Sequence, residues 1–271
     1  MTVVKNPRTR SADNERARAQ AQAQWNANPC GAVPSEEYDR EFFARVESER
    51  YRDQYWQKGF FDYTSFRGRR VLEIGVGLGT DLKQFARNGA ECFGVDITDT
   101  HLQLTRRNFE LDGLDVDLRK ADATMLPFPD GYFDCVYSFG VIHHIPDVSA
   151  VLAEVSRVLK PGGVFQVAVY HRYSIHTAML FLPAVLNGQI ARLGISGVLS
   201  TIEKGADGVA IKPYVKLYST RQLRRILLDA GLRPKTLAVR HVRFDQLPAL
   251  NVFRRFERAL GWYACAFAEK S

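Results

Sequence analysis

The sequence predicts an α/β fold, in which a mostly parallel sheet is covered by helices on both sides. From residue 69 to residue 170, short apolar runs of strand length alternate with amphipathic segments of helix length. This alternation is typical of βαβ units, whose strands pair in parallel. A chain of 271 residues, 46% hydrophobic and 25% charged, fits one large globular domain with room for an appendage.

The predicted elements follow one another with clear stop signals. We expect strands at residues 70–75, 91–96, 115–122, 133–140 and 164–170, and two closing strands at 236–244 and 258–268. A helix at 81–89 should end at Gly89, and a helix that Thr98 caps should end near Gly113. A third helix over 149–163 should end in Pro-Gly-Gly, and Thr220 should cap a fourth over 221–231.

Two segments fall outside this rhythm. Residues 1–66 are predicted to form a helical N-terminal extension, of which the first 24 or so are either a loose helix or disordered. The main domain then covers residues 67–271 and carries an insertion at 171–217, whose apolar character suits a lid or a dimer contact. The stretch from Trp25 to Ser35, which includes Cys30, is unusual but has no role that we can assign.

Composition excludes several classes of protein. The start of the chain has no apolar core of a secretory signal, and the most apolar segment, 178–199, is too interrupted for a membrane span. Four scattered cysteines without a CxxC pair suggest neither a zinc site nor a disulfide framework, so we expect a cytoplasmic protein without a metal. The net charge of +7 leaves open a nucleic-acid surface, a pocket for a small anion, or solvated helix faces.

A glycine-rich turn follows the first strand. The run VLEIGVGLGT, residues 71–80, places Gly75, Gly77 and Gly79 where ligands bind in open parallel sheets. The dinucleotide pattern G-x-G-x-x-G fits poorly, because its third glycine would fall on Thr80. Glu73 would repel a pyrophosphate but suits a cationic ligand such as S-adenosylmethionine, which carries an ammonium and a sulfonium.

Four motifs in order carry a resemblance to a known family. They are VLEIGVGLGTD, GVDIT, ADATMLPFPDGYFDCVYSFGVIHHIPD and VLKPGGVF. From about Gly68 to Tyr170 the sequence resembles class I S-adenosylmethionine-dependent methyltransferases, and within them the ubiquinone/menaquinone-biosynthesis type. The resemblance implies a Rossmann-like, doubly wound sheet of seven strands, with S-adenosyl-L-methionine as cofactor and S-adenosyl-L-homocysteine as product.

The resemblance also implies roles for residues of these motifs. One group would line the methionine end of the cofactor, and a second group would hold its ribose and adenine. The first group is Glu73, Gly75 and Gly77, with backbone contacts from Ser138, Phe139 and Gly140. The second is Asp96 on the ribose, Ile97 on the adenine face, and Asp122 with the Ala123 backbone at the adenine amino group. An acid at position 96 would also suit a nicotinamide enzyme.

Histidine and tyrosine residues follow the fourth and fifth strands, on the rim that the methyl group should face. His143, His144 and His171 are candidate general bases, although a base is needed only when the acceptor arrives protonated. The neighbouring candidates for substrate contact are Tyr170, Tyr173 and His176.

We expect in-line methyl transfer to O or N of a small metabolite, and the C-terminal arginines would suit an anionic acceptor. The alternatives are a nucleic-acid or protein methyltransferase and a non-catalytic module that binds the cofactor. Against methylation of base amino groups, the fourth strand ends in SFGV and lacks the Asn/Asp-Pro-Pro-Tyr/Phe of such enzymes. The protein is expected to act as a monomer or a homodimer, without nucleic-acid or membrane partners.

Overall fold

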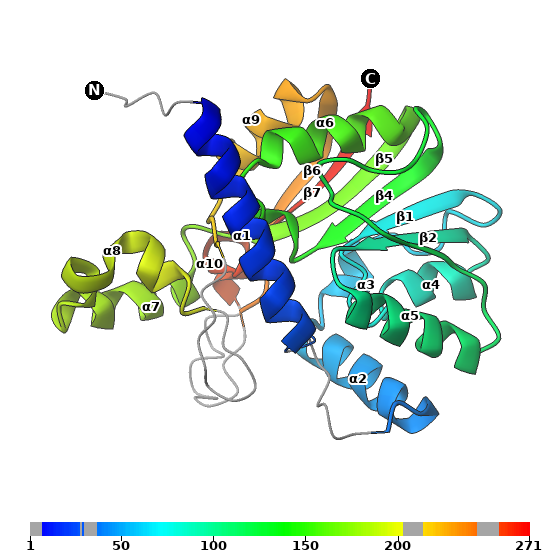
Figure 1. Ribbon diagram of the computed structural model, residues 1–271, viewed down its shortest axis with the longest axis horizontal. Helices are drawn as coiled ribbons and strands as arrows, with labels where there is room; N and C mark the ends of the chain where they lie inside the picture. The colour runs from blue at the N-terminus through cyan, green and yellow to red at the C-terminus, as the bar shows by residue number, and fades with distance from the viewer. Residues whose placement is uncertain (1–6, 28, 30–36, 203–213, 243–254) are drawn as a thin grey trace.

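A seven-stranded sheet forms the centre of the molecule (Figure 1). The structure is a computed structural model that describes residues 7–27, 29, 37–202, 214–242 and 255–271. The strand order is β3-β2-β1-β4-β5-β7-β6; the first five strands pair in parallel, and β7 is antiparallel to both of its neighbours. The strands are β1 (Arg70–Ile74), β2 (Glu91–Asp96), β3 (Asp117–Lys120), β4 (Phe133–Phe139), β5 (Leu159–Tyr170), β6 (Leu232–Arg240) and β7 (Tyr263–Lys270). This confirms the predicted fold class.

The strand order reverses between β1 and β4. Glu73 of β1 is in register with Gly94 of β2 on one side and with Tyr137 of β4 on the other. The chain runs from β1 outward to β3 and then returns to place β4 beside β1, so a crevice opens above the carboxyl ends of these strands. The fold therefore positions the glycine-rich turn at the topological switch point.

Helices cover both faces of the sheet (Figure 1). One face packs against α6 (Val148–Val158) and α9 (Thr220–Asp229), and the other against α4 (Leu82–Arg87) and α5 (Asp99–Leu111). Alternate residues of β4 serve the two layers: Val136 lies in the first core, and Cys135 and Tyr137 lie in the second. All three are fully buried, as expected for a strand with a covered face on each side.

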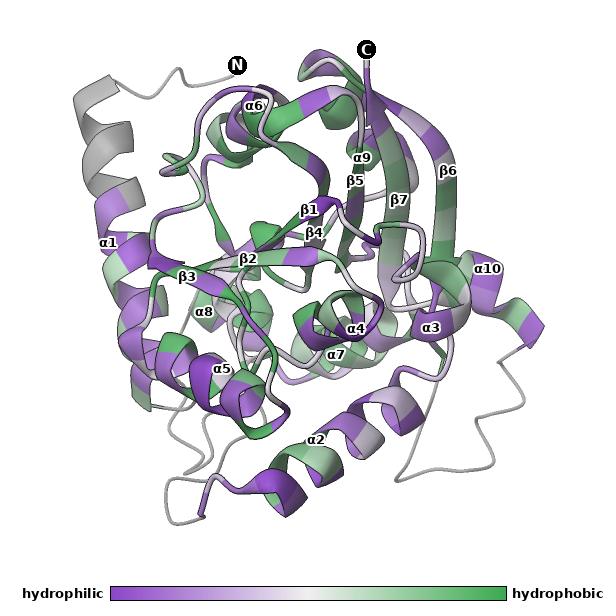
Figure 2. Ribbon diagram, turned by 90° about the vertical axis from the view of Figure 1, so that its right-hand side faces the viewer, coloured by the Kyte–Doolittle hydropathy of each residue, from purple (hydrophilic) through white to green (hydrophobic). Residues whose placement is uncertain are grey.

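The N-terminal extension is helical, as predicted, and consists of α1 (Pro7–Ala27), α2 (Arg40–Asp53) and α3 (Gln57–Phe60). Helix α1 crosses the front of the molecule and α2 lies below α5 (Figure 1), and α2 is mostly hydrophilic (Figure 2). The insertion contributes α7 (Ile175–Leu186) and α8 (Gln189–Leu199), which stand to one side of the sheet. In the part of the chain that the structure describes, none of the helices is long and apolar enough to cross a bilayer.

Four predicted boundaries were wrong. Helix α6 ends at Val158, and the Pro-Gly-Gly run belongs to β5, where Leu159 pairs with Phe133 and is fully buried. The closing strands lie at Leu232–Arg240 and Tyr263–Lys270, and they pair antiparallel from Leu232 with Lys270 to Arg240 with Tyr263. Ser219, and not Thr220, caps α9, because Ser219 and Gln222 form a reciprocal capping box.

Candidate active site

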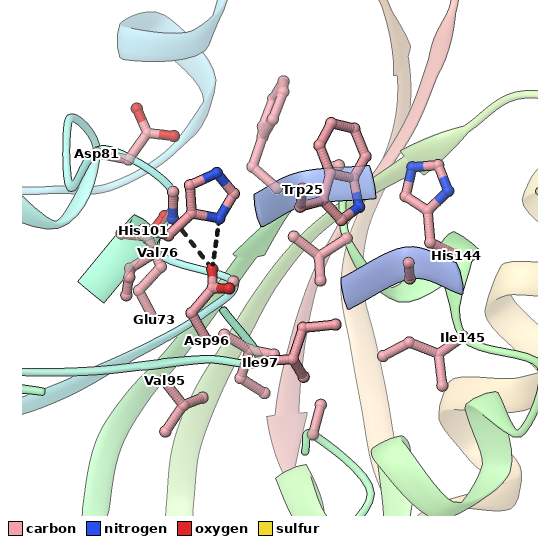
Figure 3. A pocket seen from close by; sticks show the side chains of 18 of the residues that line it. Trp25, Glu73, Val76, Asp81, Val95, Asp96, Ile97, His101, His144 and Ile145 are labelled. Atoms are coloured by element: carbon pink, nitrogen blue, oxygen red, sulfur yellow. Dashed lines mark hydrogen bonds and ion pairs between the residues drawn. The ribbon is translucent and has the colours of Figure 1, made fainter. Parts of the chain in front are cut away.

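A cavity of about 720 Å³ lies above the carboxyl ends of β1, β2 and β4 (Figure 3). Every predicted cofactor contact except Ser138 lines this cavity. These residues are Glu73, Gly75, Gly77, Asp96, Ile97, Asp122, Ala123, Phe139 and Gly140. Ser138 is fully buried instead, and its hydroxyl donates a hydrogen bond to the carbonyl of Ile74 at 3.2 Å. The structure thus brings together residues that are up to 67 positions apart in the chain, from Glu73 to Gly140.

Glu73 is a buried acid, and its Oε2 has no hydrogen-bond partner among the described residues. Burial and the nearby charge of Asp81 raise its pKa well above the usual value, and the positive charge of Arg50 opposes that rise only in part. A buried carboxylate without a paired cation is costly in free energy. The site therefore fits a ligand that brings a positive group to this oxygen.

The glycine turn leaves room beside Glu73. Gly77 has a φ of 55°, and a Cβ at this position would meet nothing within 4 Å, so the open space belongs to the cavity. A Cβ on Gly75 would lie 2.4 Å from Val141, and one on Gly79 would lie 2.7 Å from Thr105 on α5. Gly77 thus exposes backbone to a ligand, whereas Gly79 allows the turn to pack against α5.

Asp96 is held in place at the end of β2. Its Oδ1 accepts hydrogen bonds from the backbone N–H and the hydroxyl of Thr98, at 3.0 and 2.8 Å. Its Oδ2 lies 3.2 Å from Nδ1 of His101 (Figure 3). Although burial works in the other direction, these contacts with His101 and Thr98 lower the pKa of Asp96. The carboxylate is therefore ionised, and its orientation at the end of β2 is fixed by these contacts.

Helix α1 closes the predicted adenine end of the cavity. Arg18 pairs with Asp122 at 3.2 Å, and the Gln22 side chain donates to the carbonyl of Ile97 at 2.9 Å. Trp25 lies further along the same helix and faces His144, with ring centroids 5.9 Å apart (Figure 3). The N-terminal segment was predicted to be either a loose helix or disordered. Where the structure describes it, it is a helix that forms part of the cavity wall.

Arg50 and Asp81 form an ion pair at the wall of the cavity, which sequence reasoning missed. Arg50 of α2 donates from Nε to Oδ1 of Asp81 at 2.9 Å and from Nη2 to Oδ2, and its guanidinium lies 4.8 Å from the Phe139 ring. Asp81 also accepts from Gln57 and Tyr137 at 2.7 and 2.9 Å. The sequence pointed to Asp81 only through its place in the glycine-turn motif, and no local pattern marks Arg50 as the partner of Asp81.

The two adjacent histidines occupy different environments. His144 lines the cavity, and its Nδ1 donates to the carbonyl of Tyr214 at 2.9 Å. His143 is fully buried behind it and packs against Tyr170, with ring centroids 3.9 Å apart and the rings tilted by 37°. Burial and the neighbouring His144 lower the pKa of His143 well below its usual value, so it is neutral near pH 7. Geometry brings His144 to the cavity and leaves His143 outside its wall.

The remaining candidates lie away from the cavity wall. His171 is buried and donates from Nδ1 to the carbonyl of Gly261 at 3.1 Å, and burial lowers its pKa more than this bond raises it. Tyr173 is 63% exposed, and His176 packs against the ring of Trp262 at 5.4 Å. Their roles in catalysis or substrate binding stay predictions, and Cys30 lies outside the described residues. Within the described ranges, no three His, Cys, Asp or Glu side chains are grouped to hold a metal ion.

Part of the chain is similar to known methyltransferases. Residues 72–167 match the family model described as a methyltransferase domain. The ubiquinone biosynthesis O-methyltransferase of Dinoroseobacter shibae is 31% identical over 169 residues, which cover 62% of each chain. That of Paramagnetospirillum magneticum is 32% identical over 173 residues, covering 64% of this chain and 63% of the other. The match thus spans less than two thirds of these relatives.

Solved structures share the fold at lower sequence identity. A SAM-dependent methyltransferase from Methanosarcina mazei superimposes with a TM-score of 0.59 at 17% identity, over 78% of this chain and 95% of the other. One from Mesorhizobium loti gives a TM-score of 0.54 at 16% identity, over 78% and 94%. The ordered motifs and the sheet agree with the family match: residues 72–167 of this chain belong to a methyltransferase domain, and the chain shares the fold of these solved structures.

Proposed function

We propose that the protein transfers a methyl group from S-adenosyl-L-methionine to O or N of a small-molecule acceptor and releases S-adenosyl-L-homocysteine. The observation that carries this proposal is the cavity above β1, β2 and β4, whose wall contains nearly all of the predicted cofactor contacts. The orphaned Oε2 of Glu73 and the open space at Gly77 support a fit to this cofactor.

The cofactor, when bound, supplies an electrophilic methyl group on a sulfonium. Glu73 would offset its positive charge, and Arg50 at the same wall would face a carboxylate. Asp96 would accept from the ribose hydroxyls, and Asp122 from the adenine amino group. Positioning of this kind can lower the barrier to an in-line displacement by up to about 7–11 kcal/mol.

The acceptor end would lie beside Trp25 and His144, which both line the cavity (Figure 3). Ligand pockets commonly measure about 300–1,000 Å³. A cavity of about 720 Å³ that also holds the cofactor leaves room for a small acceptor. If the acceptor arrives protonated, His144 would accept the proton, because it is the histidine of the predicted pair that lines the cavity.

One experiment tests this function directly. The protein is incubated with methyl-labelled S-adenosyl-L-methionine and a fractionated cell extract, and labelled products are identified by mass. We expect a labelled metabolite that forms only with active protein. Label in RNA, DNA or protein would support the alternative acceptors, and a steep salt dependence would mark a nucleic acid. Cofactor binding without any turnover would instead indicate a non-catalytic module.

The cellular setting is part of the same proposal. Cys92, Cys135 and Cys265 are buried with unpaired thiols, which supports a reducing compartment and hence the cytoplasm. Fractionation of cells that express the protein tests this location. Sedimentation velocity distinguishes the two expected assembly states, a monomer and a homodimer.

A further inference from the structure

A second cavity, of about 570 Å³, lies on the other side of α2 from the cofactor cavity. One face of α2 lines the first cavity through Val46, Glu49, Arg50 and Asp53. The opposite face lines the second cavity through Arg40, Phe43, Ala44, Glu47, Ser48 and Tyr51. Both sets recur at spacings of three and four residues, as expected for two faces of one helix. Helix α2 is therefore a wall that the two cavities share.

The second cavity carries an excess of positive charge. Its lining contains four cations and two carboxylates, so it is positive by two charges. The cations are Arg40, Lys58, Lys83 and Arg87, and the carboxylates are Glu47 and Asp112. A concave site lined mainly by one sign of charge concentrates small ions of the opposite sign.

The two carboxylates are already shared among several cations. Asp112 contacts Arg40, Lys83 at 3.0 Å and Arg87 at 2.9 Å. Glu47 accepts from Arg87 with both oxygens at 2.8 Å. Two carboxylates therefore pair with three cations, although each carboxylate can neutralise only one positive charge. The fourth cation, Lys58, lies with its Nζ 4.0 Å from the Tyr51 ring.

Lys83 shows that this charge is built into the fold. Its side chain is only 5% exposed, and its ammonium also donates to Asn108 at 2.6 Å. A buried cation needs compensation from charge or hydrogen bonds. It sits at the start of α4, directly after the glycine turn of the cofactor cavity. An anion in the second cavity would supply the compensation that Glu47 and Asp112 provide only in part.

We propose that this second cavity binds a small anion bearing a phosphoryl group, and that its occupancy changes the affinity of the cofactor site. A phosphoryl group carries about −1.5 to −2 charges at pH 7, which matches the excess in the cavity. Arginine and lysine are its usual partners in proteins. Phe43 and Leu111, which also line the cavity, would suit an apolar body attached to the phosphoryl group.

Tyr51 provides the physical connection between the two cavities. Its ring lies under Lys58, and its hydroxyl donates to Oδ1 of Asp81 at 3.0 Å. Asp81 is the partner of Arg50, and both line the cofactor cavity. An anion that draws Lys58 toward it would shift the ring of Tyr51 and so bias the Arg50–Asp81 pair. Coupling energies between such sites are typically about 1–3 kcal/mol, or 5- to 150-fold in affinity.

Calorimetry on the full chain tests the site. Inorganic phosphate and phenyl phosphate are titrated at constant ionic strength, with chloride as the balancing anion. We expect one site per chain, and at least fivefold weaker binding in Arg40→Gln and in Lys58→Gln. Arg225→Gln on α9 is the matched control and should bind like the wild type, because Arg225 is 83% exposed and outside both cavities. Tighter binding of phenyl phosphate would identify a phosphorylated metabolite as the ligand, and equal binding would identify free phosphate.

No saturable binding up to about ten millimolar, or equal binding by wild type and both variants, would mean an adventitious ion only and would overturn the site. Circular dichroism melting confirms that each variant is folded. If Lys58→Gln fails to fold, Lys58→Met takes its place, because methionine keeps the length of the aliphatic part of lysine and removes the charge.

The coupling rests on the proposed function and has a separate test. The dissociation constant of S-adenosyl-L-methionine is measured with and without saturating phosphate, and the reciprocal experiment must give the same factor. Tyr51→Phe should bind both ligands but lose this factor. Equal cofactor affinities in the two conditions would overturn the coupling. Absence of cofactor binding in every condition would contradict the proposed function. The phosphate site would still be tested separately by its own titration.

Discussion

Glu73 and Asp96 are buried carboxylates at the ends of adjacent strands, yet their surroundings shift their pKa values in opposite directions. Burial and Asp81 raise the pKa of Glu73. Asp96 is also buried, but hydrogen bonds from His101 and Thr98 lower its pKa. Two acids with opposite shifts in one cavity mark a site where each has a separate task. At the residue scale, we therefore expect Glu73 to meet a cation and Asp96 to accept hydrogen bonds from a ligand.

Cofactor binding should therefore release a proton from Glu73. A bound sulfonium and ammonium favour the ionised form of a carboxyl whose pKa is raised in the unliganded protein. Calorimetry in two buffers of different ionisation enthalpy should show release of up to about one proton per site. Glu73→Gln should bind more weakly and show no such release. An equal buffer dependence in both proteins would remove this role from Glu73.

The raised pKa of Glu73 also makes the free energy of unfolding depend on pH. Because the folded-state pKa of Glu73 is above its unfolded value, near 4.3, its ionisation on unfolding lowers stability as pH rises from there toward the folded pKa. Urea unfolding of the unliganded protein between pH 5 and 8 should show a steeper loss of stability for wild type than for Glu73→Gln. Parallel curves would contradict this assignment.

Replacement of Asp96 tests the ribose assignment. Asp96→Ala removes an acceptor of charge-assisted hydrogen bonds, which contribute about 1.5–3 kcal/mol each, so loss of even one such bond should weaken cofactor binding roughly tenfold to 150-fold. Asp99→Ala is the control, because Asp99 is 62% exposed on the same connection and pairs with Lys120. Calorimetric affinities that are equal in Asp96→Ala and wild type would remove Asp96 from the site.

At the scale of elements, capping shows how much detail a local pattern holds. Ser219 and Thr220 are both residues that cap helices, but only Ser219 has Gln three positions later. The structure shows the reciprocal pair, with the Ser219 hydroxyl accepting from the Gln222 N–H at 3.2 Å and the Gln222 side chain accepting from the Ser219 N–H at 3.0 Å. The sequence alone contained this signal, and our choice of Thr220 overlooked it.

Replacement of the two residues separates their roles. Ser219→Ala should lower the free energy of unfolding by about 1 kcal/mol, within a range of about 0.5–2 kcal/mol for lost caps. Thr220→Ala should change it by less than about 0.5 kcal/mol, since alanine is favourable inside a helix. Urea denaturation of both variants measures the difference, and a larger loss in Thr220→Ala would reverse the assignment.

At the scale of the whole molecule, one buried polar network ties the N-terminal extension to the sheet. Asp81 follows the glycine turn, Arg50 lies on α2, Gln57 on α3 and Tyr137 on β4. Asp81 contacts all three of the other side chains, and its own is 1% exposed. The extension is therefore anchored by a charge that the cofactor cavity also contacts, so cofactor binding and packing of the extension share one set of groups.

Loss of this charge should destabilise the fold. Asp81→Asn leaves Arg50, whose side chain is 27% exposed, without its counter-charge, so the cost should lie below the roughly 3–5 kcal/mol of a fully buried broken pair but above that of an exposed one. Asp229→Asn is the control, because its pair with Arg225 is exposed and such pairs contribute about 0–1 kcal/mol. Urea unfolding measures the loss in free energy of unfolding for both variants. Equal losses would show that the buried network stabilises the fold no more than the exposed ion pair does.

The sequence by itself determined the succession of strands and helices along the chain, the glycine turn and most of the predicted residues that line the cavity. It could do so because each of these depends on residues close together in the chain: apolar runs, glycines, and acids at strand ends. Only the tertiary structure decided that α1 covers the cavity, that Arg50 pairs with Asp81, and that His144 rather than His143 lines the cavity. Those outcomes depend on which distant side chains meet, because burial and ion pairing are set by packing and not by spacing along the chain.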